Sequence, residues 1–296
     1  MSAEVSVEDI SLLKQSLPYI QRFKGTTFVV KLGGEAMRDA ETLETLVEDI
    51  SLLHLVGIRV VIVHGGGRHV TEMAASLGIE SKFVGGRRIT DDKALDVLKM
   101  VLSGKISIEI LSLLKKNSVK AMGVSGVAAG VIEARKRPPV KVSGGGDELV
   151  DFGQVGDIQR IDTELLRLLL DQGYVPVLSP LGADVEGNVL NINADTVASH
   201  IASEMHAEKL LYMTGTPGVM ADINDPTSLI SRLTADEARQ AIQEGIIKGG
   251  MIPKVEESLR SIARGTNQVH ILSAIEPHQM LLEVFTKSGA GTMIVP

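Results

Sequence analysis

Several residue types that carry redox and stacking chemistry are rare or missing from this chain. It has no cysteine and no tryptophan in 296 residues, and aromatic residues make up only 3% of it. The lack of cysteine excludes disulfides, thiolate metal sites and cysteine nucleophiles. The scarcity of aromatic rings disfavours a surface on which bases stack. A formal net charge of −7 likewise argues against nucleic acid as the main partner.

Long apolar runs are missing as well. No run approaches the roughly 20 residues that a membrane-spanning helix requires, and the first residues are polar and acidic, unlike a signal peptide. Hydrophobic residues at 44% and charged residues at 23% are ordinary for a globular enzyme. We therefore expect a soluble cytoplasmic protein that forms one large α/β domain or two lobes.

Glycine is abundant, and its 30 residues gather in short clusters that follow apolar runs. The run 27–32 ends in Gly33-Gly34, a helical pattern covers 43–53, and the run 59–63 ends in His64-Gly65-Gly66-Gly67. Strand, glycine turn and helix in this repeated order predict a parallel sheet with helical crossovers. Continuous apolar runs indicate strands that are covered on both faces.

The rest of the chain varies this pattern. Residues 7–23 have helical spacing, with Pro18 expected to kink or divide the helix. Between about 124 and 160, alternating residues favour hairpins. Alternating helices and strands then resume: helices at 165–170, after 194, near 234–244 and at 251–265, and strands at 174–178, 210–213 and 268–272. One lobe is expected to pass to the next near 180–195.

Two lysines are placed to meet an anion. Lys31 ends a predicted strand beside a glycine turn, and Lys254 follows Gly249-Gly250 in the first turn of a predicted helix. Strand ends and helix N-termini present backbone N–H groups, which bind phosphate. The alternative is that both are ordinary surface lysines. Neither a GxxxxGK[ST] loop nor a GxGxxG fingerprint is present.

Other candidates are weaker by themselves. The segment Asn191-Ile192-Asn193-Ala194-Asp195 joins a short strand to a helix, and it is either a simple helix cap or a site in which Asp195 acts. Arg88 could hold a carboxylate with two parallel hydrogen bonds, or it could be solvated like Arg87. His64 is expected to be a packed residue and not a catalytic base.

In their order along the chain, five segments resemble the amino-acid-kinase family, in particular its branch that phosphorylates N-acetylglutamate. They are Lys31-Leu32-Gly33-Gly34, Val63-His64-Gly65-Gly66-Gly67, Gly86-Arg87-Arg88-Ile89-Thr90, Asn191-Ile192-Asn193-Ala194-Asp195 and Gly249-Gly250-Met251-Ile252-Pro253-Lys254. The resemblance implies an open αβα sandwich with a mainly parallel central sheet and a β-hairpin region. It implies a helical extension at 1–23, an N-terminal lobe at 24–190 for the acyl amino acid, and a C-terminal lobe at 191–296 for ATP.

The resemblance also implies roles for single residues. Lys31 and Lys254 would stabilise the phosphoryl group in flight, and Asp195 would orient both lysines. N-acetyl-L-glutamate would be held by Gly66, Gly67, Arg88 and Asn191, with Arg88 on the α-carboxylate. The nucleotide would be bound by Thr214, Gly215, Gly218, Gly249 and Gly250. The attacking carboxylate is already ionised, so no general base is needed, and Mg²⁺ would be held largely by ATP's own phosphates.

Residues 7–23 further resemble the extra N-terminal helix of arginine-inhibited, hexameric members, which are trimers of dimers. The implied effector site comprises Tyr19, Lys209, His270, Glu283 and Gly289. The alternative is a helix that packs only on its own subunit. Two other functions stay open: a kinase for a different N-acylated acidic amino acid, and a non-catalytic sensor of arginine or nucleotide. The chain departs from the family pattern at Val127–Ala129 and at Gly215.

Overall fold

A central eight-stranded sheet organises the molecule. The computed structural model describes residues 7–141, 148–222 and 225–296. The sheet has the order β12-β14-β13-β11-β1-β2-β8-β5, and among its described strands only β13 and β14 pair antiparallel. The strands are β1 (Thr27–Leu32), β2 (Arg59–His64), β5 (Ala121–Ser125), β8 (Val175–Ser179), β11 (Lys209–Thr214), β12 (Arg232–Thr234), β13 (Val269–Ser273) and β14 (Thr292–Val295).

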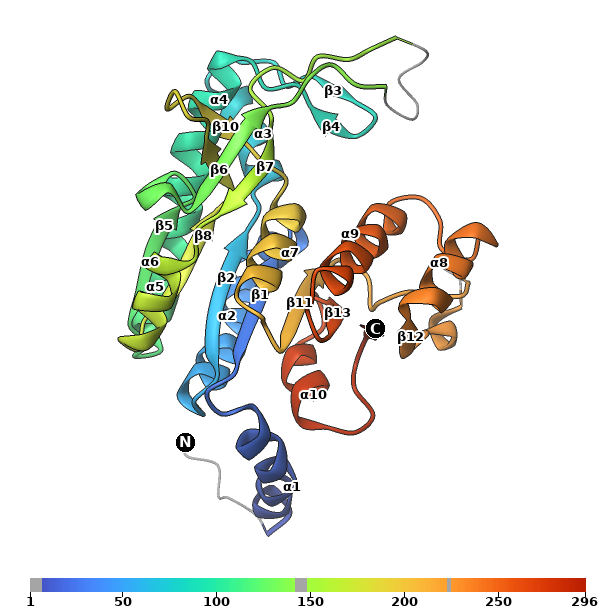
Figure 1. Ribbon diagram of the computed structural model, residues 1–296. Coiled ribbons are helices and arrows are strands. Elements are labelled where there is room, and N and C mark those ends of the chain that lie inside the picture. Colours follow the sequence, from blue (N-terminus) through green and yellow to red (C-terminus); the bar gives the residue numbers. More distant parts are fainter. Residues whose placement is uncertain (1–6, 142–147, 223–224) are drawn as a thin grey trace.

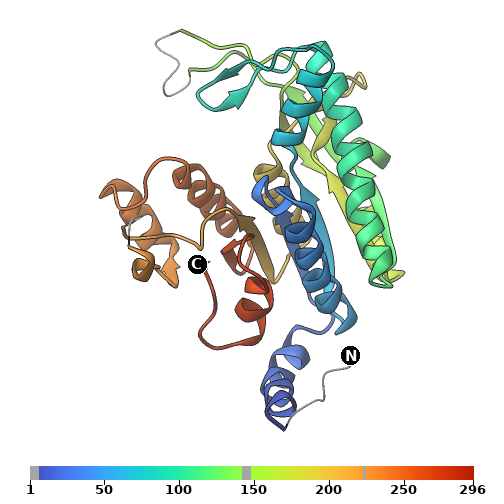
Figure 2. The ribbon, with the colours of Figure 1, turned by 180° about the vertical axis from the view of Figure 1, so that it is seen from behind.

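Helices cover both faces of this sheet (Figures 1 and 2). One face carries α6 (Glu164–Asp171), α7 (Ala194–Glu204) and α9 (Met251–Ala263), and the other carries α2 (Ala40–Leu55), α5 (Ser107–Lys116) and α10 (Gln279–Phe285). Successive strand residues point to opposite faces. Val29 therefore joins one core, while Phe28 and Val30 join the other. This double burial explains the continuous apolar runs, and the sandwich predicted from the sequence is confirmed.

The remaining elements lie mostly around one end of the sheet (Figure 1). A four-stranded sheet has the order β10-β9-β6-β7, and its β6 and β7 pair antiparallel, as the alternating pattern predicted. The other elements are β3 (Phe83–Val84), β4 (Arg87–Arg88), β6 (Ile132–Lys136), β7 (Gly156–Ile161), β9 (Leu181–Ala183), β10 (Val189–Asn191), α1 (Val7–Phe23), α3 (Gly67–Ser76), α4 (Asp92–Leu98), α8 (Ala235–Gln243), a π-helix at Lys99–Ile106 and short 3₁₀ turns at Glu35–Met37, Ala128–Gly130 and Pro226–Ser228.

The N-terminal helix differs from its prediction in one respect. Residues 1–6 of the predicted extension lie outside the described part, and α1 runs from Val7 to Phe23 without being divided at Pro18. A proline removes one backbone donor. The end of the helix is held by tertiary packing, because the Phe23 and Phe28 rings meet edge to face at 5.4 Å.

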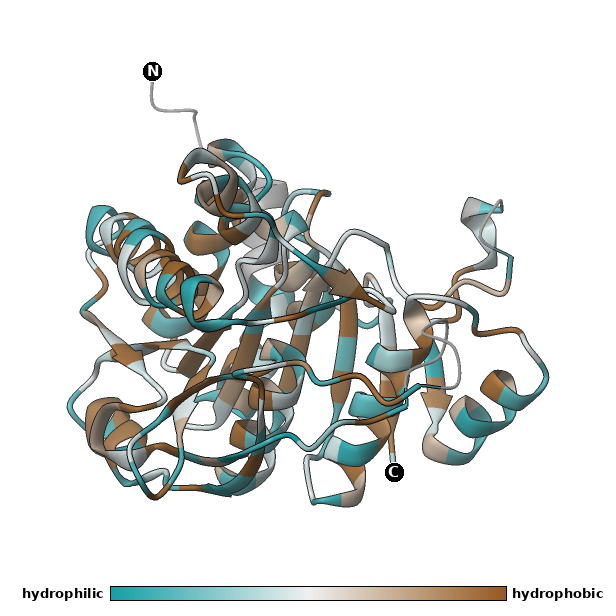
Figure 3. Ribbon diagram, turned by 90° about the horizontal axis from the view of Figure 1, so that it is seen from above, coloured by the Kyte–Doolittle hydropathy of each residue, from teal (hydrophilic) through white to brown (hydrophobic). Residues whose placement is uncertain are grey.

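The predicted boundary near residue 190 falls just before α7, yet the central sheet crosses it without a break. β1 lies between β11 from one side of that boundary and β2 from the other. Viewed from above, hydrophobic residues recur along the central strands and hydrophilic ones on the surrounding helices (Figure 3). Of the described helices, none has the length and apolar character needed to cross a membrane. The division into two lobes stays a prediction.

Candidate active site

The carboxyl ends of three neighbouring strands, β11, β1 and β2, form the centre of the candidate site. The sheet register places Leu32 at the end of β1 beside Met213 of β11 and His64 of β2. A glycine turn follows both β1 and β2. In open α/β sheets, ligands bind at this edge, where turns and helix N-termini expose backbone N–H groups. Lys31, the penultimate residue of β1, is only 7% exposed.

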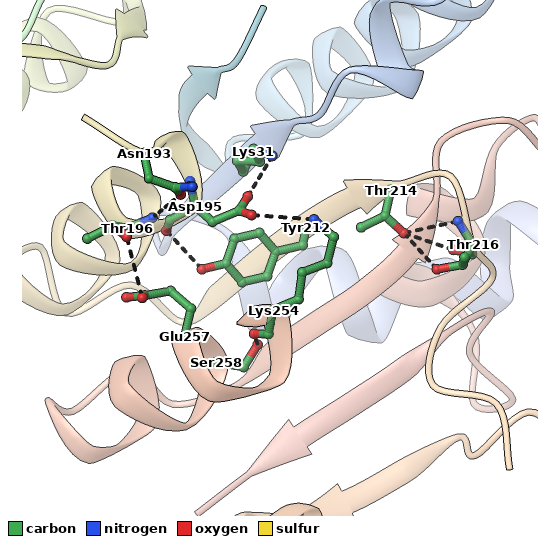
Figure 4. A network of polar contacts seen from close by, with 10 residues as sticks. All are labelled: Lys31, Asn193, Asp195, Thr196, Tyr212, Thr214, Thr216, Lys254, Glu257 and Ser258. Carbon is green, nitrogen blue, oxygen red and sulfur yellow. Dashed lines mark hydrogen bonds and ion pairs between the residues drawn. The ribbon is translucent and has the colours of Figure 1, made fainter. Parts of the chain in front are cut away.

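Asp195 joins the two predicted lysines (Figure 4). Its Oδ1 lies 2.5 Å from Lys31 Nζ, and its Oδ2 lies 3.3 Å from Lys254 Nζ. Asp195 is in the first turn of α7, and Lys254 is in the first turn of α9. Three segments that are distant in the sequence therefore converge into a cluster of two ammonium groups and one carboxylate. Its formal charge of about +1 favours a phosphoryl group.

The beginning of α7 is capped as well as charged. Asn193 is the N-cap, and its Oδ1 accepts hydrogen bonds from the backbone N–H groups of Asp195 at 2.8 Å and Thr196 at 3.2 Å. The cap alternative from the sequence is therefore confirmed for Asn193, and the site alternative for Asp195 stays a prediction. Asn193 fixes the turn that carries Asp195.

Asp195 is held in its ionised form. Burial by itself would raise the pKa of this carboxyl, but the charges and hydrogen bonds of Lys31 and Lys254 outweigh burial and lower the pKa. An ionised carboxylate with a lowered pKa is a poor general base at neutral pH. Asp195 is therefore suited to position the two lysines.

Further residues support this cluster, and sequence reasoning missed them. The Tyr212 hydroxyl donates a hydrogen bond to the backbone oxygen of Asp195 at 3.1 Å. The Thr196 hydroxyl donates to Glu257 Oε2 at 3.4 Å. One available signal was that Glu257 lies three residues after Lys254, which places the two on one side of a helix. For Tyr212, the sequence pattern indicated only that it belongs to an apolar strand.

The residues predicted to bind the acyl amino acid lie around the turn after β2. An added Cβ on Gly66 would lie 2.4 Å from Cδ1 of Ile106 in the π-helix, so a side chain there would require Ile106 to move. An added Cβ on Gly65 would come within 3.9 Å of Ala194 Cβ. The turn therefore lies against the π-helix and close to the first turn of α7, which carries Asp195.

Arg88 is anchored to the same turn. Its Nη2 donates to the Gly67 oxygen at 3.0 Å and to Thr71 Oγ1 at 2.7 Å, and its Nη1 donates to Ser81 Oγ at 2.6 Å. The guanidinium also lies over the Phe83 ring, 4.7 Å from its centroid. Arg88 is half-buried, and burial lowers its pKa. These contacts hold the guanidinium in one place, and its expected contact with a substrate carboxylate stays a prediction.

Asn191 and His64 complete this region. The Asn191 side-chain amide donates to Thr90 Oγ1 at 3.2 Å, which ties β10 to the segment after Arg88. His64 is fully buried, and burial lowers its pKa to about 4. Its Nδ1 lies 3.0 Å from the Gly65 oxygen. A neutral, inaccessible imidazole fits the packed residue that the sequence predicted.

The predicted nucleotide-binding residues lie at and after the end of β11 and in the turn before α9. Thr214 ends β11, and its hydroxyl accepts from the Thr216 backbone N–H at 3.2 Å. The Cγ of Glu35 occupies the space beside Gly215, 2.7 Å from an added Cβ. Gly218 lies against Thr292 and Leu229. Gly249 and Gly250 directly precede α9, whose first turn carries Lys254. Their role toward a nucleotide stays a prediction.

Four of the predicted effector residues, Lys209, His270, Glu283 and Gly289, also come together near the amino ends of β11 and β13. His270 Nδ1 lies 2.6 Å from Glu283 Oε1, and its Nε2 lies 3.0 Å from Lys209 Nζ. Burial lowers the pKa of Lys209 to about 8. An added Cβ on Gly289 would lie 2.7 Å from Glu283 Oε2. Tyr19 of α1 is half-buried against the core that contains Phe23, and Lys209 Nζ lies 5.1 Å from the Phe23 ring centroid.

A resident metal site is not found in the described part of the chain. No three His, Asp or Glu side chains converge there in a way that would hold a metal ion. Asp195 Oδ1 and Oδ2 are already paired with lysines. A divalent cation at this site would therefore depend on ligands that the substrate brings.

Known proteins resemble this chain over nearly its full length. The family model for the amino acid kinase family matches residues 26–273. The acetylglutamate kinase of Methanocaldococcus jannaschii is 45% identical over 97% of this chain and 96% of its own, and that of Symbiobacterium thermophilum is 45% identical over 98% of both.

Solved structures agree on the fold. The N-acetylglutamate synthase of Neisseria gonorrhoeae, solved with coenzyme A and N-acetyl-glutamate, has a TM-score of 0.83 at 28% identity. The match covers 99% of this chain, which spans 64% of that synthase. The carbamate kinase of Giardia lamblia bound to AMP-PNP has a TM-score of 0.65 at 18% identity and shares the fold. By sequence and by fold, this chain belongs to the amino acid kinase family.

Proposed function

We propose that the protein is an ATP-dependent acetylglutamate kinase of arginine biosynthesis, which phosphorylates the side-chain carboxylate of N-acetyl-L-glutamate. The observation that carries this proposal is the cluster of Lys31, Asp195 and Lys254 at the carboxyl ends of the central strands. Relatives named acetylglutamate kinase, 41–46% identical over nearly the whole chain, support the choice of substrate.

The reaction moves one phosphoryl group. An oxygen of the substrate's side-chain carboxylate attacks the γ-phosphorus of ATP, the bond from that phosphorus to the β,γ-bridging oxygen breaks, and ADP leaves with that electron pair. The product is an acyl phosphate. The attacking group is already an anion at neutral pH, so no residue has to remove a proton. The enzyme must instead supply alignment and positive charge.

The charged residues of the site match those needs. Lys31 and Lys254 approach Asp195 from two sides and give positive charge to the transferring phosphoryl oxygens. Asp195 keeps the two ammonium groups together although they repel each other. Arg88, fixed by Gly67, Thr71 and Ser81, would bind the α-carboxylate. Bound to the phosphates of ATP, Mg²⁺ would neutralise part of their charge.

Substrate trapping tests this function. Purified protein is incubated with ATP, Mg²⁺, hydroxylamine and N-acetyl-L-glutamate, and the acyl phosphate is detected as a coloured hydroxamate. Parallel reactions contain N-acetyl-L-aspartate, N-formyl-L-glutamate or unmodified L-glutamate. The proposal requires hydroxamate with N-acetyl-L-glutamate in preference to the other acceptors. A preference for a different acyl amino acid would establish that alternative instead. Nucleotide or arginine binding without any hydroxamate would establish the sensor alternative.

We also propose feedback inhibition by arginine at the group formed by Tyr19, Lys209, His270, Glu283 and Gly289. In support, Glu283 offers a carboxylate whose Oε2 accepts backbone N–H groups from Ala290 at 2.6 Å and Gly291 at 3.1 Å. A structurally similar protein, the synthase of Neisseria gonorrhoeae, was solved with L-arginine at a TM-score of 0.78 and 27% identity. A cytoplasmic hexamer, arranged as a trimer of dimers, belongs to the same proposal. Inhibition assays with L-arginine and light scattering test these two parts separately.

A further inference from the structure

The first turn of α7 is held from two directions besides its cap. From the central sheet, Tyr212 of β11 donates its hydroxyl to the backbone oxygen of Asp195 at 3.1 Å. From the neighbouring helix, Glu257 of α9 accepts a hydrogen bond from Thr196 at 3.4 Å. Both contacts reach residues 195 and 196, and α9 carries Lys254 one turn before Glu257 (Figure 4). The two contacts therefore bear on the distance between Asp195 and Lys254.

The burial of Glu257 at this place is unfavourable for the stability of the fold. The residue is 5% exposed, its Oε2 is bonded to Thr196 and to Arg260 Nη1 at 2.9 Å, and its Oε1 is buried without a partner among the described residues. A buried carboxylate with one unpaired oxygen lowers stability relative to an apolar side chain of similar size. A residue that costs stability beside a charged cluster is a candidate for a functional role.

Tyr212 is equally buried. Its side chain is fully inaccessible, and the only polar contact given by its hydroxyl in the described structure is the one to Asp195. Burial and the nearby charges of Asp195 and Glu257 raise the pKa of Tyr212 far above its usual value. The hydroxyl therefore keeps its proton and remains a donor at neutral pH.

We propose that Tyr212 and Glu257 are positioning residues for phosphoryl transfer: they hold the first turn of α7 against β11 and α9, so that Asp195 stays between Lys31 and Lys254. This inference rests on the proposed kinase function and adds to it. Neither residue is expected to touch a substrate. Their removal should therefore lower turnover and leave substrate affinity nearly unchanged.

Matched variants separate positioning from a merely structural role. Tyr212→Phe removes one oxygen, and its control is Tyr174→Phe at a surface tyrosine that is 36% exposed. Glu257→Met removes the buried carboxylate, and its control is Glu256→Met, because exposed Glu256 contacts the same Arg260 at 3.3 Å.

Glu257→Gln keeps an acceptor for Thr196. Thr196→Val removes the donor from the other side of that contact, and Thr196→Ser keeps it.

The expected kinetic result is a fall in kcat of about tenfold or more in Tyr212→Phe, Glu257→Met and Thr196→Val, since small displacements of reacting groups have effects of this size. KM for both substrates should stay within about twofold. Glu257→Gln, Thr196→Ser and both controls should stay close to the wild type. The double variant Thr196→Val with Glu257→Met should be no slower than the worse single variant, because both changes remove one contact. The thermal midpoint of Glu257→Met should not fall.

A second measurement does not depend on activity. The rate at which Lys254 reacts with an amine-acylating reagent is followed by peptide mass spectrometry, with exposed Lys120 as the internal reference. Loss of either contact should loosen the ion pair with Asp195, so Lys254 should react several times faster in the three variants. If the wild type forms no hydroxamate, the proposed function fails, and this rate alone decides whether Tyr212 and Glu257 hold the cluster.

Three outcomes would overturn the proposal. The first is an unchanged Lys254 labelling rate in Tyr212→Phe and Glu257→Met. The second is wild-type kcat in both variants of an active enzyme. The third is a fall in kcat that accompanies a lowered thermal midpoint in Glu257→Met and is not rescued in Glu257→Gln, which would make Glu257 a structural residue.

Discussion

At the scale of single residues, the two lysines of the cluster differ in their surroundings. The Lys31 side chain is 9% exposed and lies 2.5 Å from Asp195, whereas that of Lys254 is 26% exposed and lies 3.3 Å away. Both give positive charge to the site, but Lys31 is the more deeply fixed. Replacement of Lys31 should also leave Asp195 less firmly positioned, because that carboxylate would lose one of its two ion-pair partners.

We expect Lys31→Ala and Lys254→Ala each to lower kcat by about 10² to 10³, as removal of one group that stabilises transition-state charge does elsewhere. The hydroxamate assay measures this, with exposed Lys120→Ala as the control. Wild-type turnover in either cluster variant would contradict the assigned role. The Lys31 variant should show the larger effect, and the opposite order would mean that Lys254 carries most of the charge stabilisation.

Arg88 allows a test of substrate binding that leaves the lysines untouched. Its guanidinium reaches Gly67, Thr71 and Ser81 at once, and a lysine ammonium cannot reproduce this planar set of donors. Arg88→Lys should therefore raise KM for N-acetyl-L-glutamate about tenfold or more, a loss of about 1.4 kcal/mol in binding, with KM for ATP unchanged. Exposed Arg87→Lys is the matched control. An equal change in both KM values would argue against a carboxylate clamp.

At the scale of elements, the sequence was informative wherever the signal was local. Strand, glycine turn and helix repeat within short segments, so β1, β2 and the helices that follow them were predicted close to their observed bounds. Lys31, Asp195 and Lys254 were identified through motifs, and β11, β1 and the two helices bring them together. Tyr212, Thr196 and Glu257 were missed because their contacts cross between β11, α7 and α9. Such pairings depend on tertiary packing, which no local pattern encodes.

The same distinction applies to the N-terminal helix. Its existence followed from helical spacing, but the helix is not divided at Pro18, and Phe23 packs on Phe28 at its end. Phe23 is buried, and its ring faces Lys209 Nζ. Arg22 Nη2 lies 3.7 Å from Glu208 Oε1. An experiment on this helix must therefore keep residues 22 and 23.

Removal of residues 1–21 should weaken inhibition by L-arginine several-fold and leave uninhibited kcat unchanged. The deletion takes away Tyr19 and the body of α1 but retains Phe23 in the core. Inhibition curves of the full chain and the shortened chain measure the effect, and Tyr19→Ala in the full chain separates one side chain from the whole helix. Equal sensitivity of the full and shortened chains would remove α1 from the effector site.

At the scale of the whole molecule, the cluster lies where the two predicted lobes share one sheet. Lys31 belongs to β1, which is paired with β2 on one side and β11 on the other. Asp195 and Lys254 come from helices that pack on one face of that same sheet. A relative movement of the two predicted lobes would therefore have to act across the β1–β11 pair. Such a movement would change the distances from Lys31 to Asp195 and Lys254.

Buried and half-buried histidines should make the folded molecule sensitive to mild acid. His54, His64, His200 and His270 all have lowered pKa values, chiefly because burial disfavours the charged imidazole. For His64 the pKa falls from 6.5 to about 4. In the window between these values, the unfolded chain takes up a proton that the folded chain does not bind. Stability therefore falls as the pH decreases from 6.5 to 4.

His64 alone should account for up to about 3 kcal/mol of that loss, since each pKa unit corresponds to about 1.4 kcal/mol. The test is the free energy of unfolding at several pH values between 4.5 and 7 in the wild type and in His64→Leu. The variant should show a smaller pH slope, whatever its stability at pH 7, because it lacks one group that charges only on unfolding. His206→Asn is the control, since His206 is exposed and its φ of +50° is one that Asn tolerates. Parallel pH slopes in the wild type and His64→Leu would show that His64 binds its proton equally in the folded and unfolded chains.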